Sequence, residues 1–335
     1  MRTALVTGAT GYVGSHLVPT LLRAGWRVRA CGRRDRPAWL PPEVAYDRVD
    51  LTLAAPPMEG VTHVFHLAGT SSTFGAQEEV ERSNVIGTRT VAAAATAAGV
   101  ERFVHVSSTA VYGERVPLPL PITEATPPHP SRGYGLAKLL AEEEVLRQAE
   151  RGLVVTILRP TTVYGPGCVK LLASAVLDAA IERYAGLRRL GIPRDPVRVR
   201  LVHVEDLVRV CLVLAEAPGA AGEIFNVTSG TYPTSLEVAG AIAEALGMQP
   251  WPTDGPAGLG PEERRRIRAR MLTEAGMVPA IVFTEERLRF LIRPNPNTEL
   301  SIAKLRRAGA GPRRTDPLRD VAELVTWFLE RRWIV

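Results

Sequence analysis

A glycine-rich turn near the start of the chain constrains its fold more than any other stretch. Residues Thr7–Leu17 read TGATGYVGSHL and follow a short apolar run, Thr3–Val6. Three glycines, Gly8, Gly11 and Gly14, are spaced three residues apart, and an amphipathic pattern continues after them. In a strand–turn–helix unit this spacing permits a tight turn, close approach of the backbone to a pyrophosphate, and close packing of the helix on the strand. We therefore expect a turn that binds the phosphates of a dinucleotide at a helix N-terminus.

A tyrosine and a lysine stand four residues apart in a second segment. Residues Tyr134–Lys138 read YGLAK and open a helical pattern, so Tyr134 and Lys138 lie on one helix face. A cation beside a phenol favours the phenolate and moves the pKa of tyrosine from about 10 towards the working range of a proton carrier. Only three of the 41 basic residues are lysines, so a lysine here indicates a need for a compact ammonium group.

A third motif lies between the first two. The β-branched and aromatic run Phe103–Val106 leads into SSTAVYG at Ser107–Gly113. The run predicts a buried parallel strand, and ligands bind at the carboxyl ends of such strands. A hydroxyl at this strand end, together with Tyr134 and Lys138, would complete a set of groups that handle a proton.

These motifs resemble the extended short-chain dehydrogenase/reductase superfamily, in particular its NAD-dependent epimerase/dehydratase family. The similarity runs in order from residue 1 to about residue 250, and further stretches agree with it: His66–Gly69, Asn84–Thr88, Arg159–Pro166, Val202–Leu207 and Phe225–Val227. The resemblance implies an α/β fold, a Rossmann doubly wound parallel sheet with a smaller C-terminal substrate lobe. Residues 1–165, with 201–230 returning to them, are expected to form the dinucleotide-binding domain. Residues 166–200 and 231–335 are expected to form the substrate lobe.

The resemblance also implies roles for individual residues. Tyr134 is the general acid/base, Lys138 holds the nicotinamide ribose and lowers the pKa of Tyr134, and Ser108 hydrogen-bonds the reacting oxygen. Ser107 and Thr109 stand close enough to Ser108 to be confused with it. Besides Tyr134 and Lys138, the expected cofactor contacts are Gly8, Thr10, Gly11, Tyr12, Val13, Gly14, Asp50, Leu51, Leu67, Ala68, Gly69, Pro160, Thr161 and Val163. The expected substrate contacts are Ser108, Thr109 and Thr162.

The end of the second expected strand bears on the choice of cofactor. An NAD enzyme carries a carboxylate there for the ribose 2′-OH, whereas an NADP enzyme carries an arginine for the 2′-phosphate. In this chain Gly32 takes the position of the acid, and Arg33 and Arg34 follow with guanidinium groups able to clamp a phosphate. The run Val28–Arg33 resembles dihydroflavonol-reductase-like members, which use NADP. We expect NADP, with NAD as the alternative because a shifted turn would offer Asp35 to the 2′-OH.

Composition limits the partners and the compartment. The net charge of +6 is spread out, and basic stretches such as Glu262–Arg268 are interleaved with acids, which favours solvated helix faces over a nucleic-acid site. No run approaches the length of a membrane span, and an expected strand follows Met1-Arg2 directly, leaving no room for a signal peptide. Three separated cysteines show neither metal nor disulfide spacing. We expect a cytoplasmic protein that needs no metal, and analogy with the family suggests a homodimer.

The substrate is open between two classes. Nucleotide-sugar epimerases and 4-ketoreductases usually carry an asparagine where this chain has Thr162 and an arginine where it has Val199, although Arg198 and Arg200 flank that position. The segment Pro279–Ile292, followed by Leu300–Leu305, resembles the C-terminal lobe of 3β-hydroxysteroid-dehydrogenase-like members, which act on hydrophobic alcohols and ketones. We favour hydride transfer between a nicotinamide and the ketone or secondary alcohol of a small, apolar molecule. A nucleotide-sugar epimerase or 4-ketoreductase is the alternative.

Two further classes are disfavoured. A 4,6-dehydratase needs an acid pair in the Ser108 segment, and this chain has Thr109-Ala110 there. A cofactor-binding regulator that does no chemistry usually loses its tyrosine or its lysine, and both Tyr134 and Lys138 are present.

Overall fold

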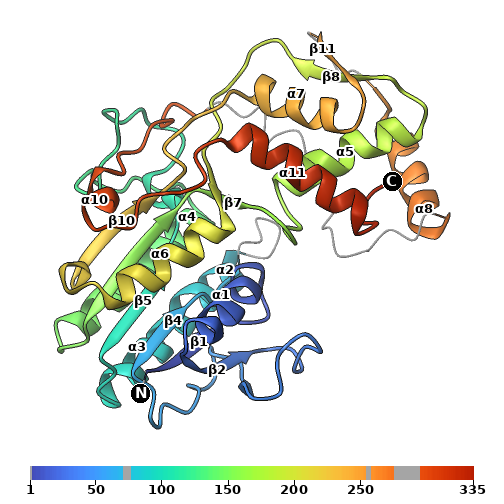
Figure 1. Ribbon diagram of the computed structural model, residues 1–335. Helices are drawn as coiled ribbons and strands as arrows, with labels where there is room; N and C mark the ends of the chain where they lie inside the picture. Colours follow the sequence, from blue (N-terminus) through green and yellow to red (C-terminus); the bar gives the residue numbers. More distant parts are fainter. Residues whose placement is uncertain (1, 71–76, 254–257, 275–294) are drawn as a thin grey trace. The chain divides into compact units, whose positions relative to one another are not determined.

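A computed structural model describes residues 2–70, 77–253, 258–274 and 295–335 (Figure 1). The chain divides into two compact units. The first unit comprises Met1–Thr161, Val204–Thr228 and Glu299–Pro312, and the second comprises Thr162–His203, Ser229–Thr298 and Arg313–Val335.

The return of Glu299–Pro312 to the first unit differs from the division expected from the sequence, which put this segment in the substrate lobe. Its physical cause is a parallel bridge between Ile122 and Leu300. The Ile122 N–H donates to the Glu299 carbonyl and the Ser301 N–H donates to the Ile122 carbonyl, both at 2.8 Å. Ile122 is fully buried, so this bridge ties the segment to the core of the first unit.

A parallel seven-stranded sheet forms the centre of the first unit, in the order β10-β6-β5-β4-β1-β2-β3. Strands β1, β4 and β6 are buried along their whole length, which is typical of a parallel sheet covered on both faces. The strands are β1 (Thr3–Thr7), β2 (Arg27–Gly32), β3 (Ala45–Arg48), β4 (His63–His66), β5 (Arg102–Val106), β6 (Val155–Pro160) and β10 (Glu223–Val227).

Helices cover both faces of this sheet: α1 packs beside α6, and α3 packs beside α4 (Figure 1). Val91 of α3 and Val145 of α4 join Phe103 and Ile157 of the sheet in one buried apolar cluster. The helical elements of the first unit are α1 (Tyr12–Arg23), α2 (Gln77–Glu81), the π-helix η1 (Arg82–Ile86), α3 (Gly87–Ala97), the 3₁₀ helix η2 (Thr109–Tyr112), α4 (Tyr134–Ala149), α6 (Val204–Glu216), the 3₁₀ helix η3 (Pro218–Ala220) and α10 (Ala303–Arg307).

The strand order reverses direction at β1, because β2 lies on one side of it and β4 on the other. Ligands of doubly wound sheets bind in the crevice at such a switch point, outside the carboxyl ends of the strands. Gly8 follows β1 with φ +67°, and a Cβ atom on it would lie 2.8 Å from the backbone nitrogen of Ala68, which follows β4. Only glycine fits this close approach.

The second unit holds two short parallel strand pairs, β7 with β9 and β8 with β11, together with helices. Helix α11 packs on α7, and α5 packs on α8. Among the helices of the described residues, none is both long enough and apolar enough to cross a membrane. The elements are β7 (Thr162–Tyr164), α5 (Leu172–Tyr184), β8 (Arg189–Pro193), β9 (Leu201–His203), α7 (Ser235–Ala245), β11 (Gln249–Thr253), α8 (Pro261–Glu274) and α11 (Pro317–Glu330).

Candidate active site

The glycine turn between β1 and α1 has the geometry of a phosphate cradle. The Gly11 N–H donates to the Gly8 carbonyl at 2.9 Å, and a Cβ atom on Gly14 would lie 2.5 Å from that same carbonyl oxygen. No side chain caps the N-terminus of α1, which begins at Tyr12. The first turn of α1 holds no acidic residue, and the positive end of the helix dipole lies at this turn. These features fit the pyrophosphate of a dinucleotide.

Three adjacent hydroxyls, of which the family resemblance favours Ser108, follow the end of β5 and have different partners. The Ser108 side chain lies close enough to the Tyr134 hydroxyl to lower the pKa of that hydroxyl through hydrogen bonding. The Ser107 hydroxyl instead donates to Glu142 Oε1 at 2.5 Å, and the Thr109 hydroxyl donates to the Pro160 carbonyl at 3.3 Å. Among the three, Ser108 is thus the one whose side chain is brought to Tyr134.

Helix α4 carries both Tyr134 and Lys138. Burial raises the pKa of Tyr134 to about 12, against the opposing effect of the Ser108 hydrogen bond. Burial also lowers the pKa of Lys138 to about 8, against the opposing negative charge of Glu142. The Lys138 ammonium donates to the Val106 carbonyl at 2.9 Å. The structure therefore gives the tyrosine a raised pKa, rather than the lowered one expected from Lys138.

A buried charge network lies one helical turn beyond Lys138 and was not foreseen in the sequence. Glu142 Oε1 accepts from Arg159 Nε at 3.0 Å, and Glu142 Oε2 accepts from Arg159 Nη2 at 2.6 Å. Arg159 Nη1 also donates to the Tyr112 hydroxyl at 2.9 Å, and that hydroxyl donates to Asn226 Oδ1 at 2.8 Å. The signal in the sequence was Glu142 four residues after Lys138, on the same helix face.

Asn84 opens a stretch that carries the family resemblance, but no role was predicted for it from the sequence; it is fully buried in the π-helix η1. Its amide nitrogen donates to the carbonyls of Thr70 and Val80 at 3.0 and 2.8 Å. Its Oδ1 has no hydrogen-bond partner among the described residues. A Cβ atom on Gly69 would lie 2.4 Å from Asn84 Oδ1 and 3.5 Å from Lys138 Nζ, so this unpaired acceptor and the ammonium converge beside Gly69. π-helical turns are frequent at functional sites.

The remaining cofactor candidates in the first unit lie at strand ends, in the glycine turn or at the start of α1. Thr10 lies close to Gly32, since a Cβ atom on Gly32 would be 3.1 Å from Thr10 Oγ1. The Ala68 N–H donates to Thr7 Oγ1 at 3.2 Å, which fixes the 67–69 turn against β1. Pro160 ends β6, and the Thr161 N–H donates to the Val227 carbonyl at 3.0 Å. The other members of this set are Val13 in α1, Leu51, which is buried beyond β3, and Leu67, which follows β4.

Arg33 and Arg34, which directly follow β2, are both exposed. Their guanidinium groups make no hydrogen bond or ion pair with another described residue. Asp35, the competing candidate for a ribose hydroxyl, pairs instead with Arg48 at 2.7 Å. Hydrogen bonds from Thr52 hold the pKa of Asp50 below its usual value, and the charge of Arg33 acts in the same direction. Arg33 and Asp50 therefore lie close enough to interact.

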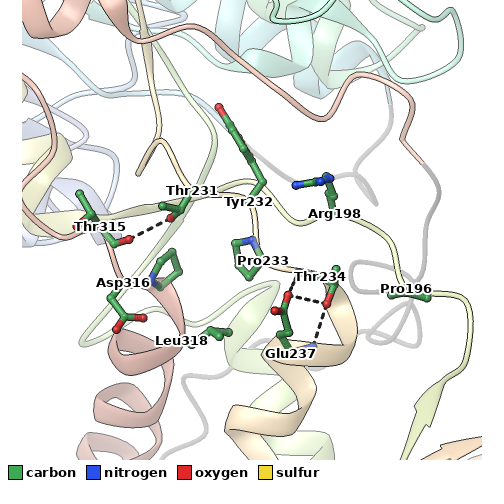
Figure 2. A pocket seen from close by; sticks show the side chains of 11 residues that line it. Pro196, Arg198, Thr231, Tyr232, Pro233, Thr234, Glu237, Thr315, Asp316 and Leu318 are labelled. Carbon is green, nitrogen blue, oxygen red and sulfur yellow. Dashed lines mark hydrogen bonds between the residues drawn. The ribbon is translucent and has the colours of Figure 1, made fainter.

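Thr162 and Val163 belong to β7 of the second unit. Arg200 of that unit donates to the Asn297 carbonyl at 2.9 Å. Arg198 lines a pocket of about 590 Å³ between the N-termini of α7 and α11, together with Tyr232 and Glu237 (Figure 2). The apolar segment Pro279–Ile292 lies outside the described residues.

Across residues 2–70, 77–253, 258–274 and 295–335, no three His, Cys, Asp or Glu side chains are grouped so that they could hold a metal ion.

Comparison with known proteins decides the family. The model of the NAD dependent epimerase/dehydratase family matches residues 4–228. The chain belongs to this family. The expected resemblance, the Rossmann fold and the assignment as an NAD(P)-dependent enzyme of the extended short-chain dehydrogenase/reductase type are thereby confirmed.

Curated relatives of this epimerase/dehydratase-family chain include proteins of several kinds. It is 31% identical to the sterol demethylase protein B of Methylococcus capsulatus, over 99% of this chain and 100% of that protein. It is 32% identical to a 4-hydroxy-2-methyl-3-oxo-4-farnesyl-3,4-dihydroquinoline-1-oxide ketoreductase of Stigmatella aurantiaca, over 69% of each. It is 31% identical to the uncharacterized protein y4nG of Sinorhizobium fredii, of which it spans only 59%.

A solved structure shows similarity over nearly the whole chain. The protein MoeE5, in complex with UDP-glucose and NAD, is 27% identical and superimposes with a TM-score of 0.72, over 98% of this chain and 99% of MoeE5. The similar proteins thus include one whose structure holds both NAD and a nucleotide sugar.

Proposed function

We propose that this chain is an NADP-preferring reductase or dehydrogenase that acts on the ketone or secondary alcohol of a small apolar molecule. The observation that carries the proposal is the Tyr134–Ser108 hydrogen bond beside the buried Lys138. We assign dinucleotide binding to the first unit and substrate binding to the second.

Each group in this set has a distinct chemical role. When bound, a nicotinamide cofactor supplies or accepts the hydride. Ser108 orients the reacting oxygen, and Tyr134 donates its proton to that oxygen in the reducing direction or removes it in the oxidising direction. Lys138 holds the ribose and, as an ammonium, stabilises the tyrosinate that remains after proton transfer. Thr109, and Thr162 of the second unit, are proposed to line the substrate.

The preference for NADP rests on the free guanidinium groups of Arg33 and Arg34. Neither group makes a hydrogen bond or ion pair with another described residue, although the charge of Arg33 acts on the Asp50 carboxylate. The acid that would favour NAD, Asp35, is paired with Arg48. Hydrogen bonds to a charged group contribute about 1.5–3 kcal/mol each, or roughly ten- to a hundredfold in affinity. Fluorescence titration of both cofactors tests this: NADP should bind at least about tenfold more tightly than NAD, and Arg33→Ala should remove most of the difference.

The apolar substrate class is supported by the names of two relatives, one a sterol demethylase protein and the other a ketoreductase of a farnesylated quinoline oxide. A thermal-shift panel tests the class, because a ligand that binds only the folded state raises its stability. Hydrophobic ketones and sterols, with NADP present, should raise the melting temperature. UDP- and TDP-sugars should leave it unchanged.

A nucleotide-sugar epimerase or 4-ketoreductase is the second candidate. It is supported by the similarity to MoeE5 with UDP-glucose and by the position of Arg198 on an open pocket of the second unit. An epimerase converts substrate with no net change in cofactor, whereas a reductase consumes one reduced nicotinamide per product. Stabilisation by a nucleotide sugar at sub-millimolar concentration, lost in Arg198→Ala, would favour this second candidate.

We also propose a homodimer in the cytoplasm. Ile86 and Leu146, beside α3 and on α4, are apolar and each 38% exposed, and family analogy places the dimer contact on these helices. The cysteines Cys31, Cys168 and Cys211 are free and buried, which suits a reducing compartment. Sedimentation equilibrium should give a dimer for the wild type and a monomer for Leu146→Glu.

A further inference from the structure

The loop that follows β2 uses its charged side chains in two different ways. The guanidinium of Arg36 donates to three carbonyls of the same loop, those of Val44, Pro41 and Leu40, at 2.7, 2.5 and 3.3 Å. This side chain is therefore committed to closing the loop. Arg33 and Arg34, three and two residues earlier, make no hydrogen bond or ion pair with another described residue.

The hydroxyl of Tyr46 is bonded to the backbone of this loop at Arg34, between Arg33 and Arg36. Tyr46 lies on β3, paired with Ala30 of β2, and its hydroxyl donates to the Arg34 carbonyl at 2.6 Å. The hydrogen bond crosses from the neighbouring strand to the turn. It fixes the carbonyl of Arg34 and with it the direction in which the Arg33–Arg34 turn leaves the sheet.

The same hydroxyl occupies the space that a side chain at residue 32 would need. A Cβ atom on Gly32 would lie 3.0 Å from the Tyr46 oxygen and 3.1 Å from Thr10 Oγ1. Contacts this short require the neighbour to move by a few tenths of an ångström. In NAD enzymes a carboxylate at this strand end accepts the ribose 2′-OH. This chain has glycine at the position, and Tyr46 would crowd a side chain placed there.

We propose that Tyr46 is a specificity-determining residue for the cofactor. It positions the Arg33–Arg34 turn so that both guanidinium groups face a 2′-phosphate, and it keeps the place of the NAD-type carboxylate filled. The inference rests on the proposed preference for NADP. It adds a positioning residue that contacts the arginines through the backbone and that the sequence motifs do not mark.

The test compares dissociation constants of NADP and NAD, measured by quenching of protein fluorescence, in three proteins. In Tyr46→Phe, the loss of one hydrogen bond is expected to weaken NADP binding by about three- to tenfold and to leave NAD binding within about twofold. Tyr184→Phe is the matched control, because its hydroxyl donates to Glu274 in the second unit at 2.9 Å. This control should leave both constants unchanged.

Gly32→Ala gives a second variant, because its added methyl group crowds the Tyr46 hydroxyl, and also Thr10 Oγ1, without removing either group. It should reduce the NADP-to-NAD affinity ratio in the same direction as Tyr46→Phe. An unchanged ratio in both folded variants, beside a wild type that prefers NADP, would overturn the role of Tyr46 and leave the cofactor proposal standing. Equal affinities for the two cofactors in the wild type would overturn the cofactor proposal itself, and this inference with it.

Discussion

Glu142 and Arg159 form a two-point ion pair in the interior of the first unit, with distances of 3.0 and 2.6 Å. Their side chains are only 2% and 4% exposed. The pair joins α4, the helix of Tyr134 and Lys138, to strand β6. Because both charges are removed from water, each requires the other: a buried charge that loses its partner is strongly destabilising.

We expect Arg159→Met to lower the free energy of unfolding by about 3–5 kcal/mol, since it leaves the buried Glu142 carboxylate without its two-point ion-pair partner, with only the Ser107 hydroxyl bonded to it. Arg319→Met is the control, because the Arg319–Glu323 pair is exposed at 76% and 46% and such pairs contribute about 0–1 kcal/mol. Denaturant unfolding of the two variants measures the difference. Similar losses of unfolding free energy in the two variants would show that the buried pair stabilises the fold no more than the exposed pair does.

Gly14→Ala tests the phosphate turn. The added Cβ atom would lie 2.5 Å from the Gly8 carbonyl and 2.6 Å from Ala9 Cα, so the turn must shift, at a cost of about 1–3 kcal/mol. We expect NADP affinity to fall at least about tenfold. Gly240→Ala, in α7, meets no atom within 4 Å and should stabilise by about 0.5–1 kcal/mol. Binding titrations and thermal unfolding distinguish them; a Gly14→Ala protein with native affinity would argue against the cradle.

The affinity for NADP should depend on pH through Lys138. Burial lowers its pKa to about 8, so the ammonium is present below pH 8 and is progressively lost above it. Near pH 7 to 7.5, where the 2′-phosphate is mostly dianionic, we expect the dissociation constant to change little, and above pH 8 we expect it to rise by up to about tenfold per pH unit. In Lys138→Met binding should be weaker and flat over this range. A wild-type curve as flat as that of the variant would exclude Lys138 from cofactor binding.

The same shift has an opposite effect on folding. The pKa of Lys138 is lower in the folded chain than in the unfolded one, so the unfolded chain binds more protons between pH 8 and the ordinary lysine value of 10.5. The contribution of this group to stability therefore rises with pH across that window, while NADP affinity falls.

The elements that depend on short, contiguous sequence patterns were predictable from the sequence. The strand, glycine turn and helix around Gly8 are contiguous, and so is the helix that begins at Tyr134, so periodicity and glycine spacing suffice to place them. The choice of Ser108 over Ser107 was not decidable on that basis. It depends on Glu142, 35 residues away from Ser107, which accepts the Ser107 hydroxyl and can be located only in three dimensions.

Strand register hid other relationships. Tyr46 contacts Arg34 because β3 pairs with β2, and no sequence pattern between the two residues predicts this contact. The return of Glu299–Pro312 to the first unit likewise depends on the bridge from Leu300 to Ile122, across 178 positions of chain. Tertiary pairing of this kind leaves no local periodicity to read.

The most direct test of the proposed reaction is the oxidation of NADPH by wild type and Tyr134→Phe, with the hydrophobic ketone that stabilises the protein most. The wild type should consume one NADPH per alcohol formed. The variant keeps the ring and loses the proton, so its turnover should fall by about a hundredfold or more while its affinity for NADP is unchanged. Turnover of Tyr134→Phe equal to that of the wild type would contradict the assignment of Tyr134 as the proton donor.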